Sequence, residues 1–179
     1  MNTPPETVSK LDAARRQLST AISLFIREQD TISTHTLTAA GHQILLDLAK
    51  VRGVASLTKD SPHVRPERRA EFAAAVNEAE NFFKHADRDP NKVLVFRPAQ
   101  TEYLLLDAVL IYQQLSGRPF QSGLVYMVWF IAGHPDLIDL RDLPEMSSLL
   151  EKMGPPEEVE RSDLVGFLET SLNIPNVDL

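Results

Sequence analysis

The chain has 179 residues, of which 43% are hydrophobic, and this length suits one domain with its own buried core. It contains no cysteine, which excludes disulfides, thiolate metal sites and a cysteine nucleophile. The net charge of −7 disfavours non-specific binding of the whole protein to nucleic acid.

The first half of the chain predicts three helices. Ser9 can cap a helix from about residue 9 to residue 29, and the short link at residues 30–32 predicts that the next helix returns beside it. That second helix should start at residue 33 or 34 and stop at Gly53. A third follows Pro66 and ends near His85. Residues 93–96 are too short to define a sheet, and we expect an extended connector lying on the core.

The second half predicts two buried helices, at residues 101–116 and 120–132, because both are apolar nearly all round. After residue 135 come short amphipathic segments, at about 143–153 and 162–172. The sequence therefore predicts an all-α fold. We expect a single bundle of about five main helices at residues 9–135, with an acidic helical C-terminal extension at residues 136–179 packed on the same domain. A homodimer through the fourth or fifth helix is also expected.

Charge and hydropathy along the chain bear on partners and location. Residues 136–179 hold eleven acidic and three basic side chains, whereas residues 50–69 hold six basic and two acidic ones. The basic segment is either a solvated loop or a contact for phosphate or an acidic partner. The longest apolar stretch, residues 124–132, falls short of the roughly 20 residues that span a bilayer, and the N-terminus has no signal-peptide pattern. We expect a cytoplasmic protein without a membrane partner.

A polar cluster closes the third predicted helix. Asn81 and His85 are four residues apart and share a helical face, and Lys84 borders that face. An imidazole, an amide and an ammonium together could polarise a phosphodiester. The alternative is structural, because cationic side chains suit the C-terminal end of any helix.

The run Asn-Phe-Phe-Lys-His at a helix end resembles the R-N-x-x-x-H signature of HEPN domains, which are all-α bundles, often dimeric, and in many cases metal-independent RNases. The resemblance implies that His85 and Asn81 correspond to the histidine and polar residue of the family. The arginine position falls on Glu80, and a carboxylate cannot replace a guanidinium that faces phosphate. The resemblance thus implies RNA association through a degenerate or inactive nuclease site. The chain is also similar to uncharacterised bacterial proteins that share the stretch FKHADRDP.

Metal binding is the second possibility at this cluster. The pattern Asp87-x-Asp89-x-Asn91 imitates the start of an EF-hand loop, but Lys92 and Pro98 stand where glycine and glutamate are required. A looser site would use His85, Asp87 and Asp89. We predict no metal and no cofactor.

Asp107 lies within a nearly all-apolar helix, where an unpaired carboxylate is costly to bury. It must find a partner, and His35, His42, His85 or an arginine are the candidates. An Asp–His couple would mark a site, whereas a single ion pair would be structural. His35 and His42 share a face but lie about 10 Å apart along the helix, too far to share one metal ion directly.

Three functions remain open. The first is a HEPN-like, RNA-associated protein that uses His85, Asn81 and Lys84, which requires Asn81 and His85 to be exposed on a groove or toward a second copy. The second is a non-enzymatic protein-interaction module. The third is a small-molecule binder with a pocket around Asp107, Trp129 and Tyr103. The chain has no glycine-rich phosphate loop, no G-x-S-x-G and no H-E-x-x-H motif.

Overall fold

The computed structural model describes residues 4–58, 65–87, 89–134, 137 and 160–173. These residues form only helices and connecting segments, so the predicted all-α class is confirmed. The elements are α1 (Lys10–Ile26), α2 (Thr31–Arg52), the short 3-10 helix η1 (Pro66–Arg68), α3 (Arg69–Lys84), α4 (Gln100–Ser116), α5 (Gln121–Gly133) and α7 (Arg161–Asn173).

Local hydrogen bonds define where the first two helices begin and end. The Ser9 Oγ accepts the Asp12 N–H at 3.1 Å and starts α1. Asp30 accepts the Ser33 N–H at 2.7 Å, so α2 begins at Thr31, two or three residues earlier than the sequence predicts. Gly53 ends α2 with φ of 69°, a left-handed conformation that favours glycine.

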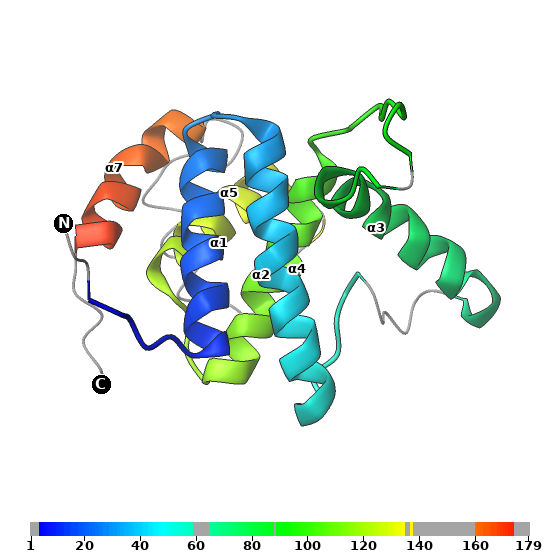
Figure 1. Ribbon diagram of the computed structural model, residues 1–179. Helices are drawn as coiled ribbons and strands as arrows, with labels where there is room; N and C mark the ends of the chain where they lie inside the picture. Colours follow the sequence, from blue (N-terminus) through cyan, green and yellow to red (C-terminus); the bar gives the residue numbers. More distant parts are fainter. Residues whose placement is uncertain (1–3, 59–64, 88, 135–136, 138–159, 174–179) are drawn as a thin grey trace.

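The bundle is built around α1 and α2, which lie side by side (Figure 1). Their close approach depends on Gly41, because a Cβ there would lie 3.0 Å from Leu18 Cγ and 3.2 Å from the carbonyl oxygen of Ala14. α4 packs against both α2 and α1, and α5 packs against α1 and α4. The core is aliphatic and aromatic, and its largest fully buried side chains include Tyr126, Phe130, Leu18, Ile22, Leu45 and Ile111.

The two most apolar helices, α4 and α5, are buried within their own chain. Their buried residues include Leu105, Ala108, Ile111, Val128 and Ile131. Tyr103 of α4 and Leu124 of α5 are nevertheless 46% and 41% exposed, and a homodimer through these helices stays a prediction.

α7 lies on the opposite side of the bundle from α3 (Figure 1). It packs on α5 and α1, and its Leu164 and Leu168 are completely buried in the same core. It matches the amphipathic segment predicted at residues 162–172. The segment predicted at 143–153 lies outside the described residues.

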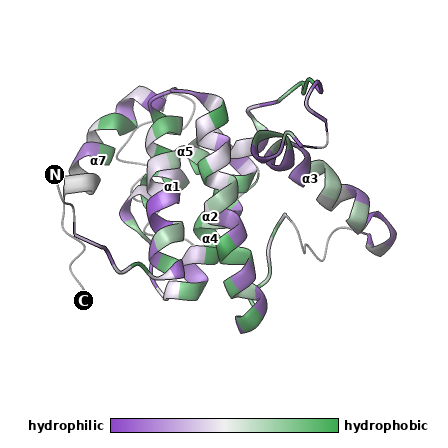
Figure 2. Cartoon of the chain, in the orientation of Figure 1, coloured by the Kyte–Doolittle hydropathy of each residue, from purple (hydrophilic) through white to green (hydrophobic). Residues whose placement is uncertain are grey.

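α3 projects from the side of the bundle and packs mainly on α2 (Figure 1). Ala79 is buried, Phe82 and Phe83 are half-buried, and Ala70 and Ala75 are exposed. Its outer end, with η1, is hydrophilic (Figure 2). α3 is therefore less enclosed than a helix in the core of a bundle.

Residues 93–96 form the extended connector that the sequence predicts, but only alternate residues face the protein. Phe96 packs on His35 and Phe83, with ring centroids 5.1 and 5.2 Å apart. Val93 and Val95 are each 87% exposed. The connector thus covers α3 and α2 with one face and leaves an apolar face open to solvent.

Candidate functional site

An open groove of about 780 Å³ lies between α3 and the loop that follows it. One wall is the outer face of α3, and the other is the loop at residues 85–92. The groove is lined by Ala74, Ala75, Glu78, Asn81, Phe82, His85, Asp87, Asp89 and Lys92. It is the larger of the two cavities described for this structure.

Asn81 and His85 both line this groove, and both are exposed. The backbone N–H of His85 donates to the carbonyl oxygen of Asn81 at 3.1 Å, which closes the last turn of α3. His85 then adopts an extended backbone and turns the chain into the loop. The structure thus brings together the amide and the imidazole that the sequence placed on one face.

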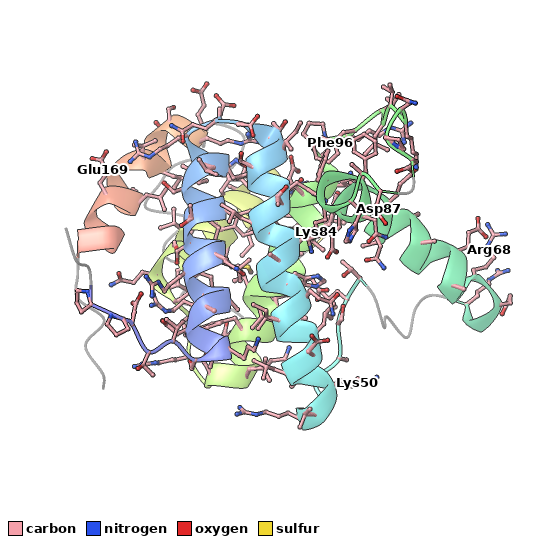
Figure 3. The ribbon with its side chains drawn as sticks, in the orientation of Figure 1. Lys50, Arg68, Lys84, Asp87, Phe96 and Glu169 are labelled. Carbon is pink, nitrogen blue, oxygen red and sulfur yellow. The ribbon has the colours of Figure 1, made fainter. Side chains whose placement is uncertain are left out.

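Lys84 does not join them, contrary to the predicted set. Its Nζ lies 2.6 Å from Glu80 Oε1, and it is absent from the groove lining. Lys84 lies three residues after Asn81 and borders its face, but the ion pair with Glu80 holds the Lys84 ammonium outside the groove lining. Figure 3 shows Lys84 and Asp87 at the inner end of α3 and Arg68 at its outer end.

Among the described residues of the groove, Lys92 supplies the cation instead, and sequence reasoning missed it. Its Nζ lies 3.3 Å from Glu78 Oε1 and 4.0 Å from Asp89 Oδ2, so it connects the loop back to α3. Its place depends on how the loop closes, which no helical spacing predicts. With Glu78, Asp87 and Asp89 against Lys92, and with His85 neutral, the lining carries a net charge of −2.

The carboxylates of the groove do not converge with His85. Within the described parts of the chain, no three histidine, aspartate or glutamate side chains are grouped so that they could hold a metal ion. The alternative site at His85, Asp87 and Asp89 therefore lacks the geometry that it requires.

Asp107 is completely buried and accepts hydrogen bonds from two directions. His42 Nε2–H donates to its Oδ2 at 2.8 Å, and the Ser56 and Thr58 hydroxyls each donate at 2.6 Å. The Leu57 N–H donates to Oδ1 at 2.8 Å. Burial raises the pKa of Asp107, but the His42 hydrogen bond and charge and the two hydroxyls outweigh it and lower the pKa to about 2. Asp107 therefore fixes the loop after α2 to the core.

His35 serves a different structural role one turn from the start of α2. Its Nδ1 lies 3.0 Å from the Thr101 Oγ1, and the rings of Phe83 and Phe96 pack edge-on against it. Burial lowers the pKa of His35, and Lys84 lowers it further while Glu80 raises it. His35 joins α3 and the 93–96 connector to the bundle, and it is not part of the groove.

Neither of the two cavities described for this structure is lined by Asp107, Trp129 or Tyr103, and the small-molecule pocket around them stays a prediction. Asp107 is enclosed by the loop after α2. Trp129 packs on Phe25, with ring centroids 4.7 Å apart, and Tyr103 packs edge-on against Phe130 at 5.8 Å. Tyr103 and Trp129 share Phe130 and His134 as neighbours, with ring centroids 5.8 to 6.5 Å apart.

The basic segment at residues 50–69 does not form one patch in its described part. Lys50 and Arg68 lie far apart in Figure 3. Arg52 donates to the carbonyl oxygen of Leu115 at 2.8 Å, and Arg68 pairs with Glu71 at 3.0 Å. Two of these cations therefore have partners within the chain.

Two further observations bear on function. None of the helices in the described ranges is both long and apolar enough to cross a membrane. No protein family, no curated protein and no solved structure matches the chain in comparisons with known proteins.

Proposed function

We propose that the protein is a non-enzymatic interaction module, and that the groove along α3 binds a basic, amphipathic segment of a protein partner. The observation that carries this proposal is the chemistry of the groove lining. Ala74, Ala75 and Phe82 provide an apolar wall, and Glu78, Asp87 and Asp89 provide acidic groups around it.

The charge of the groove favours a basic ligand. The lining carries a net −2, and the whole chain carries −7. A lysine- or arginine-bearing segment would be attracted toward this surface, whereas a phosphate backbone would be repelled.

The shape of the groove also suits a peptide. Alanines keep the wall of α3 low, so the groove stays open, and the half-buried Phe82 offers an aromatic face for an aliphatic side chain. The exposed amide of Asn81 and imidazole of His85 can hydrogen-bond the peptide backbone.

One observation favours RNA association of the HEPN kind as a second candidate. Asn81 and His85 are both exposed and line the same groove, which the resemblance requires. Glu80, which stands at the arginine position of the HEPN signature, forms an ion pair with Lys84. A site of this kind would hold RNA without an arginine for the phosphate.

Fluorescence anisotropy with labelled probes tests the first candidate. The probes are an amphipathic lysine-rich peptide, the same peptide with glutamates in place of lysines, and a single-stranded RNA of mixed sequence. We expect the lysine-rich peptide alone to bind, more weakly as salt is raised. Ala75→Arg should abolish binding by filling the groove, and Ala70→Arg is the matched control, since Ala70 is exposed on α3 but outside the lining.

The same samples test the second candidate. Binding or cleavage of RNA that survives EDTA and disappears in His85→Ala would favour RNA association and reject the basic-peptide groove. Equal binding of the lysine and glutamate peptides would contradict the charge argument. Equal loss in Ala70→Arg and Ala75→Arg would place the binding surface elsewhere.

A further inference from the structure

A second cavity, of about 220 Å³, lies where the end of α1 meets the starts of α2, α4 and α7. It shares no residue with the groove along α3. Its lining consists of Phe25, Glu28, Gln29, Thr31, Thr34, Pro98, Thr101, Glu102 and Arg161. At about 30 Å³ for each water in the liquid, its volume corresponds to about seven waters, which limits a ligand to a small molecule.

Arg161 is held rigidly at the edge of this cavity. Its guanidinium carbon lies 4.0 Å from the ring centroid of Phe25 and 4.9 Å from that of Trp129. Cation–π attraction to these two rings, whose planes are 75° apart, holds the guanidinium in place and limits the directions in which its N–H groups can point. An arginine fixed in this way loses little further conformational entropy when it binds a ligand.

The N–H groups of Arg161 are still available. Its nitrogens lie 3.6 Å from carboxylate oxygens of Glu28 and of Glu102, which is longer than a hydrogen bond. Among the described residues, its guanidinium donates no hydrogen bond. These N–H groups can therefore donate to a carboxylate in the paired geometry that arginine favours.

On the acidic side of the cavity, the negative charge of Glu102 is only partly balanced by nearby positive groups. The Glu102 side chain is only 18% exposed, and burial raises its pKa, while Arg161 and His134 lower it. A positive group placed beside this carboxylate would stabilise its charged form. Glu28, which is largely exposed, stands at the solvent side of the cavity.

The positive charge of Arg161 and the negative charges of Glu28 and Glu102 together limit which ligands the cavity can bind. A simple anion would meet two carboxylates, and a simple cation would meet the guanidinium. We propose that this cavity binds a small zwitterion of the α-amino acid class, with its carboxylate on Arg161 and its ammonium group beside Glu102 and Glu28. This inference goes beyond the proposed groove function and does not depend on it.

Thermal denaturation with matched probes tests the inference. The probes are free glycine, alanine, serine and threonine at millimolar concentration, each compared with its N-acetyl derivative, which lacks the ammonium group, and its amide, which lacks the carboxylate. We expect at least one free amino acid to raise the melting temperature by about 2 °C or more, and both derivatives to have less than half that effect. If every free amino acid leaves the melting temperature unchanged and gives no heat in titration calorimetry, the inference is wrong. Equal stabilisation by a derivative would also overturn it.

Substitutions then locate the binding site. Glu102→Gln keeps the side-chain shape and should weaken binding at least about tenfold in calorimetry, because one full charge contact is lost. Arg161→Lys keeps the charge but removes the two-pronged donor, and we expect a similar loss. Arg27→Gln is the matched control, since Arg27 pairs with Glu169 at 3.1 Å and also joins α1 to α7, but lies outside the cavity. Unchanged affinity in Glu102→Gln, or an equal loss in Arg27→Gln, would contradict the proposed site.

Discussion

Two places where histidine lies near carboxylates, both within the described part of the chain, differ in their surroundings. Asp107 and His42 are completely buried between α2 and α4. His85, Asp87 and Asp89 are exposed around the groove beside α3. The buried carboxylate has its acceptors filled by the protein, whereas the exposed groups remain open to a ligand. The residue types are the same, and burial with hydrogen bonds to both oxygens distinguishes a structural carboxylate from one that is open to a ligand.

The largest expected effect on stability comes from a substitution that disrupts the buried pair of Asp107 and His42. Asp107→Asn removes the charge that accepts from His42, Ser56 and Thr58, and leaves at least one of these donors without a partner. We expect urea denaturation to show a loss of about 3 kcal/mol or more of unfolding free energy.

Asp47→Asn is the control for this loss. Asp47 is an exposed carboxylate of α2 that accepts from Gln43 at 2.9 Å, and its change should stay within about 0.5 kcal/mol. Similar losses in the two variants would mean that burial does not separate the roles of these carboxylates.

The loss of stability in acid provides a second test of the contrast between the buried and the exposed carboxylates. The pKa of Asp107 is lowered from 3.8 to about 2, so its charge stabilises the fold above about pH 4, and this contribution is lost as the pH falls toward 2. The loss should amount to about 2 kcal/mol. Urea curves at a series of pH values should show a steeper decline below pH 4 for the wild type than for Asp107→Asn. Parallel curves would show that Asp107 is not held in its charged form.

A smaller effect concerns the contact that joins α3 to the bundle. Burial lowers the pKa of His35, so below about pH 6.5 the unfolded chain takes up the proton first and stability falls as the pH falls. The slope from one such group is at most about 1.4 kcal/mol per pH unit. Stability of His35→Gln should depend less on pH between 7 and 5.

Hydrogen exchange gives a local readout of the same change. At pH 5 the amides of α3 should exchange faster relative to those of α1 than at pH 7, once intrinsic rates are corrected for. Equal acceleration in both helices would mean that protonation does not act at the contact of His35 with Phe83 and Phe96.

The smallest expected effects come from substituting two lysines near the groove, Lys84 and Lys92. Lys84→Ala removes an ion pair in which the side chains of Lys84 and Glu80 are 34% and 12% exposed. It should change stability by about 1 kcal/mol or less and leave peptide binding unchanged. Lys92→Ala makes the groove more acidic and should strengthen binding of a lysine-rich peptide about two- to tenfold. Weaker binding in Lys92→Ala would show that Lys92 holds the loop in its binding shape.

Sequence reasoning worked where local chemistry decides the structure. The Ser9 cap, the Gly53 stop and the apolar runs of α4 and α5 each depend on neighbours within a few residues. Sequence reasoning failed for contacts between segments that lie far apart in the chain. The periodicity of α3 indicates an apolar face but does not show that this face contacts mainly one helix and leaves the rest open.

The same limit applies to the candidate sites. The pattern around Asp107 required a buried partner and included His42, but it did not indicate Ser56, Leu57 and Thr58, which lie about 50 positions earlier in the chain. Lys92 reaches the groove only because the loop turns back to Glu78. Contacts of this kind are set by tertiary structure and have no spacing rule.

The bonds of Asp107 also imply an order of folding. The loop at residues 56–58 joins a carboxylate 49 to 51 positions away, so it can be fixed only after α4 has docked beside α2. α1 and α2 are joined by a short link and can pair early, from local contacts. α3 follows this loop in the chain and packs mainly on α2, so it should be the last of the bundle helices to gain protection during refolding.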